Sequence, residues 1–262
     1  MKKLIIGALI FLILISPIFA GTIKLATTTS TDNSGLLLKL LPPFEKKYGI
    51  RVDVIAVGTG KAIKLGENGD VDLILVHARA AEDKFVADGY GVNRRDVMYN
   101  DFIILGPGKD HAKEKTSSSA VEALTRIAAK KATFISRGDD SGTNKKELAV
   151  WKKANIKPEG KWYLSVGQGM GATLQIANEK QGYTIADRGT YLAYHNKIDL
   201  NIVYKGDKLL FNPYGVIAVN PAKHPHVNYM DAMLLIGWLT SAEGKKIINT
   251  FKIEGEQLFY SQ

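Results

Sequence analysis

The sequence predicts an α/β protein in which two α/β domains are joined by a two-strand hinge. Apolar, β-branched segments alternate with helical segments along most of the chain, a pattern typical of a mostly parallel sheet with helical crossovers. Two longer extended segments, near residues 98–106 and 211–220, interrupt this alternation. A chain that crosses to a second domain through one segment and returns through the other can close around a ligand. A single larger α/β domain is the alternative.

Residues 1–20 are predicted to be a secretory signal peptide. Lys2 and Lys3 precede an apolar run over residues 4–15, and Ala20 is a small residue suited to cleavage. The apolar run is shorter than the roughly 20 residues that span a bilayer, so an uncleaved anchor is the less favoured alternative. We therefore expect the mature protein to be secreted, in the periplasm or on the extracytoplasmic face of the membrane.

The first predicted domain contains three strands that alternate with three helices. Each strand is apolar and leads into a polar or glycine-containing turn, and glycines end the helices. The strands are expected at residues 22–25, 51–57 and 71–76, and the helices at residues 36–48, 61–65 and 78–87.

The second predicted domain repeats the alternation between the two extended segments. Two further helices within residues 227–251, with a break at residues 241–244, then complete the first domain. We expect residues 21–105 and 213–262 to form domain 1 and residues 106–212 to form domain 2. In domain 2, strands are expected at residues 133–136, 183–186 and 201–204, and helices at residues 117–130, 141–154, 169–179 and 187–195.

The composition excludes several classes of function. The chain has no cysteine, so disulfides, thiol catalysis and cysteine-ligated metals are ruled out. Its net charge of +9 falls to +7 without the signal peptide, which carries two lysines and no acid. The lysines are scattered in short pairs and do not interleave with aromatic residues, unlike those of a single-strand nucleic-acid binder. The histidines show no metal-binding spacing. We expect no cofactor, no bare metal cation, no nucleic-acid partner and a monomer.

Three small polar turns each follow a predicted strand and open a predicted helix. They lie at residues 27–30, which are rich in threonine, at residues 58–60, and at residues 137–143. A helix N-terminus has unpaired N–H groups and a positive dipole end, so it can hold an anion without a charged side chain. Because the carboxyl ends of parallel strands meet in one crevice, these turns are expected to converge there. Each turn alone would also fit an ordinary helix cap.

Arg137 is the most specific single candidate for an anion contact, since a guanidinium can make two parallel hydrogen bonds to an oxyanion. The alternative is that it only pairs with Asp139 or Asp140, and both roles are compatible. A catalytic carboxylate at either position would repel an anion, so these acids are expected to orient Arg137 or to stabilise a helix start. His77 follows an apolar strand and is a candidate hydrogen-bond donor in the wall of the cleft.

These motifs together resemble the tungstate-binding proteins of ABC importers. The resemblance covers nearly all of the mature chain, and the threonine run and the Arg-Gly-Asp-x-Ser-Gly-Thr segment are its most specific parts. The latter is also similar to a segment of phosphate-binding proteins, and Asn144 stands where histidine is common in the family. The matching segments are residues 26–31, 34–37, 57–62, 69–72, 76–77, 79–80, 136–139, 141–143, 183–184 and 187–190.

The resemblance implies a type II periplasmic binding protein fold, capture of tungstate between the domains, and delivery to an ABC permease in the membrane. No bond of the ligand would change, so we expect no enzyme activity. The implied contacts to the anion are Thr28, Thr29, Ser30, Thr59, Gly60, Arg137, Ser141, Gly142 and Thr143.

Other ligands and roles stay open on the sequence. Molybdate has nearly the same size, charge and shape as tungstate, and sulfate and phosphate are smaller. A phosphate that carries a proton would need a buried acceptor, for which Asp72 and Asp139 are the candidates. An extracytoplasmic oxyanion sensor domain would use the same fold without a permease. An enzyme such as a transferase would need a catalytic acid or base in the cleft.

Overall fold

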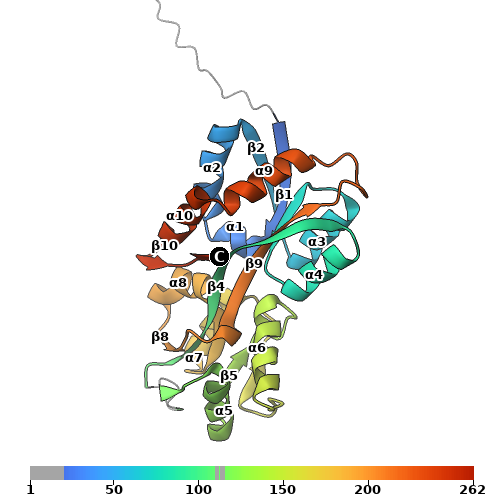
Figure 1. Ribbon diagram of the computed structural model, residues 1–262. Helices are drawn as coiled ribbons and strands as arrows, with labels where there is room; N and C mark the ends of the chain where they lie inside the picture. Colours follow the sequence, from blue (N-terminus) through green and yellow to red (C-terminus); the bar gives the residue numbers. More distant parts are fainter. Residues whose placement is uncertain (1–20, 110–111, 113–115) are drawn as a thin grey trace, which may run out of the picture.

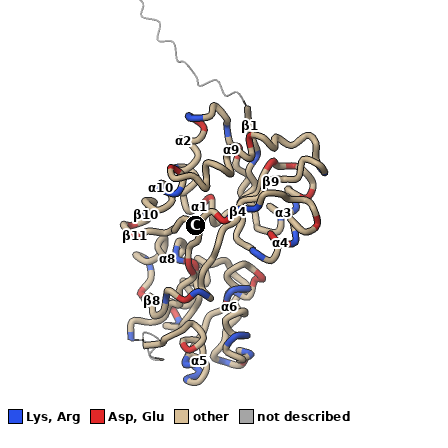
Figure 2. The backbone as a smooth tube through the Cα atoms, in the orientation of Figure 1, with Lys and Arg blue, Asp and Glu red and all other residues tan. Residues whose placement is uncertain are grey.

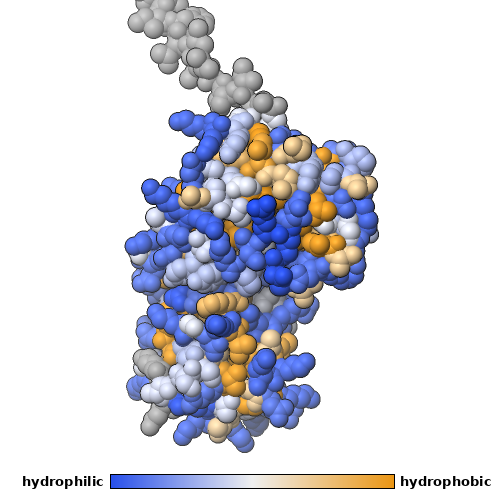
Figure 3. All heavy atoms as spheres, in the orientation of Figure 1, coloured by the Kyte–Doolittle hydropathy of each residue, from blue (hydrophilic) through white to orange (hydrophobic). Residues whose placement is uncertain are grey.

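The computed structural model describes residues 21–109, 112 and 116–262, and the predicted signal peptide lies outside these residues. The chain forms two lobes, one above the other, with the strands β4 (Gly91–Pro107) and β9 (Phe211–Val219) running from one lobe into the other (Figure 1). No helix among the described residues is long and apolar enough to cross a membrane. Hydrophilic residues cover most of the face shown in Figure 3, with hydrophobic residues in smaller groups.

The first lobe is built on a mixed sheet with the strand order β2-β1-β3-β9-β4-β12. β1 is parallel to β2 and β3, whereas β9 runs antiparallel to both β3 and β4. Its elements are β1 (Gly21–Thr28), α1 (Thr29–Asn33), α2 (Leu37–Tyr48), β2 (Ile50–Val57), α3 (Thr59–Asn68), β3 (Leu73–Val76), α4 (Arg79–Ala87), α9 (Tyr229–Leu239), α10 (Ala242–Thr250), β10 (Lys252–Ile253), β11 (Glu256–Gln257) and β12 (Tyr260–Ser261).

In the second lobe, the far half of β4 pairs antiparallel with both β7 and β8, and β5 pairs parallel with β6. The prediction of a mostly parallel sheet is therefore wrong, because the two crossing strands run antiparallel to their neighbours. The elements here are α5 (Ala120–Lys130), β5 (Phe134–Ser136), α6 (Gly142–Lys153), β6 (Tyr163–Ser165), α7 (Met170–Glu179), β7 (Thr184–Asp187), α8 (Arg188–Tyr194) and β8 (Leu200–Tyr204), with short 3-10 turns at His195–Lys197 and Lys208–Leu210.

The two extended segments expected from the sequence are the crossing strands β4 (Gly91–Pro107) and β9 (Phe211–Val219). β4 pairs with β9 as far as Asp101 and with β7 from Phe102 onward, so one strand belongs to both lobes. The domain limits at residues 105 and 213 remain a proposal. Ile103 and Leu105 pack with the second lobe, and β4 pairs with β7 from Phe102 onward, so the packing favours a first limit nearer residue 101.

Candidate functional site

The threonine-rich turn is held by its own hydroxyl groups. β1 ends at the buried Thr28, whose Oγ1 accepts a hydrogen bond of 3.2 Å from the Thr31 backbone N–H and so caps α1. The same oxygen lies 3.0 Å from the Ser30 hydroxyl and 2.7 Å from the Thr31 hydroxyl. Thr29 and Ser30 are exposed beyond it. The turn therefore presents hydroxyl groups whose positions are fixed by hydrogen bonds.

The glycine turn lies beside the threonine turn at the same edge of the sheet. Thr28 is paired in register with Val57, so the chain enters the two turns from neighbouring positions of two parallel strands. Gly58 caps α3 in extended conformation, and a Cβ built on Gly58 or on Gly60 would meet no atom within 4 Å. Thr59 is half-buried between these two glycines. The approach to the backbone N–H groups at this helix start is therefore open.

His77 follows β3 at the same edge and contacts the threonine turn directly. Its Nε2 lies 3.2 Å from Thr28 Oγ1 and 3.4 Å from Ser30 Oγ, and its Nδ1 lies 3.1 Å from Asn212 Oδ1. Its ring packs on Tyr214 with a centroid separation of 4.7 Å. Burial lowers the pKa of His77, although Asn212 and Asp187 act in the opposite direction. His77 was a candidate on the sequence, but no sequence pattern indicated that its partners would be Asn212 and Tyr214 of β9.

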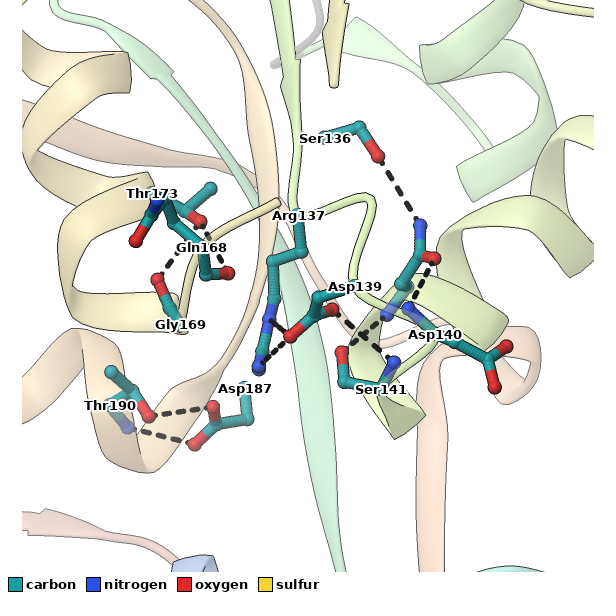
Figure 4. Close-up of polar contacts among 11 residues, drawn as sticks. Ser136, Arg137, Asp139, Asp140, Ser141, Gln168, Gly169, Thr173, Asp187 and Thr190 are labelled. Atoms are coloured by element: carbon teal, nitrogen blue, oxygen red, sulfur yellow. Dashed lines mark hydrogen bonds and ion pairs between the residues drawn. The ribbon is translucent and has the colours of Figure 1, made fainter. Parts of the chain in front are cut away.

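In the second lobe, β5 leads into a tight loop that carries Arg137 and ends at the start of α6. Arg137 donates from Nε at 3.1 Å and from Nη2 at 2.5 Å to one oxygen of Asp139, as Figure 4 shows. The other Asp139 oxygen accepts from the Ser141 backbone N–H at 3.3 Å. Burial raises the pKa of Asp139, but the hydrogen bonds from Ser141 and Arg137 outweigh it and hold that pKa below its ordinary value. The acid therefore orients Arg137, as expected.

A buried carboxylate supports this loop from within the lobe. Glu147 accepts hydrogen bonds from Ser136 at 2.7 Å, from Tyr163 at 2.7 Å and from Trp151 at 3.2 Å. Asn144 links this group to the loop, since it donates to the Ser136 hydroxyl at 3.3 Å and accepts from the backbone N–H of residue 140 at 3.2 Å. Asn144 is thus a structural residue of the loop. Glu147 was not singled out by the sequence, because nothing local marks it as buried.

The start of α6 in the second lobe lies close to His77 of the first lobe, and His77 in turn contacts the threonine turn. A Cβ built on Gly142, the first residue of α6, would lie 3.9 Å from His77 Cε1. Ser141 caps α6 and Thr143 is buried in its first turn. In Figure 4 the guanidinium of Arg137 points toward Asp187, whose carboxylate accepts from the backbone and hydroxyl of Thr190. The threonine turn and the Arg137 loop therefore belong to one interlobe site.

The chemistry of this site suits an oxyanion. Its donors are hydroxyls, backbone N–H groups at helix starts and one guanidinium. No group of three or more His, Asp or Glu that could hold a metal ion occurs among the described residues. Basic and acidic residues are scattered over both lobes in Figure 2. The nine predicted contact residues remain a prediction, and the structure places them on the turns that open α1, α3 and α6.

Two lobes joined by crossing strands, with the start of α6 in one lobe close to His77 of the other, define a type II periplasmic binding protein. In agreement, the family model described as "PBP superfamily domain" matches residues 19–243. The chain is 50% identical to the tungstate-binding protein TupA of Peptoclostridium acidaminophilum, over 91% of this chain and 85% of that one. It is 45% identical to TupA of Campylobacter jejuni, over 88% of this chain and 87% of the other.

Solved structures agree with these relatives. A tungstate-binding protein TupA from Desulfovibrio alaskensis G20 is 47% identical, with a TM-score of 0.89, and the match covers 93% of this chain and 99% of the other. A crystal structure of the tungstate ABC transporter from Geobacter sulfurreducens is 59% identical, with a TM-score of 0.79, and the match covers 88% of this chain and 98% of that one. The chain belongs to the family of the tungstate-binding proteins.

Proposed function

We propose that this protein captures tungstate between its two lobes, outside the cytoplasm, and delivers it to the permease of an ABC importer. The proposal rests on one observation: the start of α6, at Gly142, lies opposite His77, which contacts the threonine turn. Neutral donors from both lobes, held in place by hydrogen bonds, can replace the hydration shell of a dianion. Membership of the tungstate-binding family supports tungstate as the ligand.

Two carboxylates were the candidate acceptors for a protonated phosphate, and only Asp139 lies at the site, since Asp72 precedes β3 at the end opposite to His77. Asp72, one candidate acceptor, binds the backbone N–H groups of Lys24 at 2.7 Å and Asn228 at 2.6 Å. The other, Asp139, is held by Arg137 and Ser141 and has a lowered pKa. Asp139 is ionised and its oxygens keep lone pairs that can accept from a proton-bearing anion, so phosphate is tested as a competitor in the titration below.

Capture and release require no catalysis. Tungstate enters and leaves with its bonds unchanged, so we expect the protein to be a binding subunit and not an enzyme. We expect it to act as a monomer whose ligand-bound form is recognised by the permease. A permease gene and an ATPase gene beside the gene for this chain would support import over an extracytoplasmic sensor role.

Calorimetric titration of residues 21–262 with tungstate, molybdate, sulfate and phosphate tests the proposal. We expect one tungstate ion per chain, molybdate as the nearest competitor, and sulfate and phosphate far weaker. Phosphate or sulfate binding more tightly than tungstate would overturn the ligand assignment. Absence of heat with all four anions, confirmed by thermal-shift measurements, would overturn oxyanion capture altogether.

A further inference from the structure

We infer that His77 is a positioning residue of the anion site that takes up a proton from solvent when a dianion binds, turning the hydroxyl protons of Thr28 and Ser30 toward the ligand. This inference deepens the proposed function and rests on it. It follows from the hydrogen-bond directions around the ring, from the groups that pack against it, and from its place between the two lobes.

The hydrogen bonds of the crossing strands fix the state of the imidazole ring. Asn212 donates from Nδ2 to the side-chain oxygen of Asn100 at 2.8 Å, and both side chains are buried. Asn212 therefore turns its oxygen toward His77 Nδ1, which lies 3.1 Å away. An amide oxygen only accepts, so the neutral ring carries its proton on Nδ1. Nε2 is then an acceptor that faces the threonine turn.

A neutral His77 competes with an anion for hydroxyl protons. Thr28 Oγ1 and Ser30 Oγ lie 3.2 Å and 3.4 Å from Nε2, and each hydroxyl has only one proton to donate. A hydroxyl that donates to Nε2 cannot donate to a ligand. Once Nε2 is protonated it becomes a donor to the same oxygens, so their protons turn away from the ring and are available to the ligand and to the neighbouring hydroxyls of the turn. The added positive charge also favours a dianion.

The surroundings of His77 keep it neutral before the anion arrives. The ring is packed by Tyr214 and Asn212 of β9, by the threonine turn, and by the start of α6 at Gly142. Burial raises the pKa of Tyr214, so this phenol stays neutral. The Asp187 carboxylate at the end of β7 acts to raise the pKa of His77. Burial lowers that pKa by more, so the net shift is downward.

The sign of the coupling follows from these two states. The pKa of His77 is lowered in the ligand-free protein, and a bound dianion raises it, so a proton is taken up at pH values between the two. In that window the affinity falls as the pH rises. The fall approaches about tenfold per pH unit if one full proton is taken up, because the coupling between proton and anion is reciprocal.

Titration calorimetry of residues 21–262 with tungstate, in buffers of different ionisation enthalpy, counts the protons directly. Within about pH 5 to pH 8, where histidines titrate, we expect net proton uptake for the wild-type chain at pH values above the lowered pKa of the ligand-free ring. The same uptake is expected for His226→Gln, which replaces an exposed histidine of the loop before α9. His77→Gln should still bind, since its amide can serve the threonine turn, but with no net uptake and a flat dependence of Kd on pH.

Two outcomes would overturn the inference while leaving tungstate capture intact. The first is wild-type binding with no net proton, and the second is undiminished uptake in His77→Gln. If His77→Gln does not fold, long-range ¹H–¹⁵N spectra of the wild-type histidines decide the question. We expect the ring of His77 to change from the Nδ1–H form to the doubly protonated form on addition of tungstate, and an unchanged ring would contradict the inference. Loss of all tungstate binding by the wild-type chain would instead overturn the proposed function.

Discussion

Replacing Arg137 with alanine is expected to weaken tungstate binding on the order of 100-fold or more, equivalent to about 3 kcal/mol. Arg137 supplies the guanidinium of the candidate site, and hydrogen bonds to Asp139 already hold this group in place. Its removal therefore takes away a preoriented cationic donor and leaves the Asp139 carboxylate facing the anion. Calorimetric titration of the variant against the wild-type chain measures the change.

Two further variants make the test specific to the geometry of Arg137. Arg137→Lys keeps the charge but not the planar pair of donors, so it should recover only part of the affinity. Arg126→Ala removes a second-lobe arginine that pairs with Glu122 on α5, and its Kd should equal that of the wild type. Equal affinities for wild type and Arg137→Ala, with both chains folded, would show that Arg137 serves only to pair with Asp139.

Replacing Arg188 with alanine is expected to lower the free energy of unfolding by about 3–5 kcal/mol. Arg188 opens α8, and its Nε and Nη2 bind the two oxygens of Asp101 at 2.6 Å and 2.5 Å. Both side chains are buried, and Asp101 lies on β4 where this strand passes between the lobes. The single variant leaves a buried carboxylate without its partner. Urea unfolding followed by circular dichroism gives the change.

A double-mutant cycle separates the loss of a partner from the value of the pair itself. The variant with both Arg188→Ala and Asp101→Ala should be more stable than the sum of the two single effects predicts, since neither charge is left alone. Lys47→Ala removes an exposed partner of Glu243 and should leave the unfolding midpoint unchanged. Strictly additive effects at positions 101 and 188 would show that the ion pair does not hold β4 to α8.

The parts of the fold that follow from local chemistry were predictable from the sequence. The strands expected at residues 22–25 and 51–57 are followed by helix starts, although β1 runs on through Thr28, and their parallel register brings the two turns together as expected. The short helix at Thr29–Asn33 was missed because five residues carry no periodic pattern. The C-terminal strand at Tyr260–Ser261 was missed because two residues give no alternation, and its pairing with β4 is purely tertiary.

The candidate site was predictable where one segment supplies both the turn and its side chains. The loop from Arg137 to Ser141 contains its own orienting acid, so its pairing could be foreseen. The contact between His77 and Asn212 joins residues that are 135 positions apart, and no local pattern reports it. The role of Glu147 beneath the loop likewise depends on burial by Trp151 and Tyr163, which only the packed lobe shows.

A crystal structure of residues 21–262 grown with tungstate, with data collected on both sides of a tungsten absorption edge, tests the central claim most directly. The account predicts one strong anomalous peak per chain between the threonine turn and the start of α6, with oxygens bonded to groups from both lobes and to Arg137. A peak elsewhere on the chain, or a site that uses donors from one lobe alone, would contradict capture of the anion between the lobes.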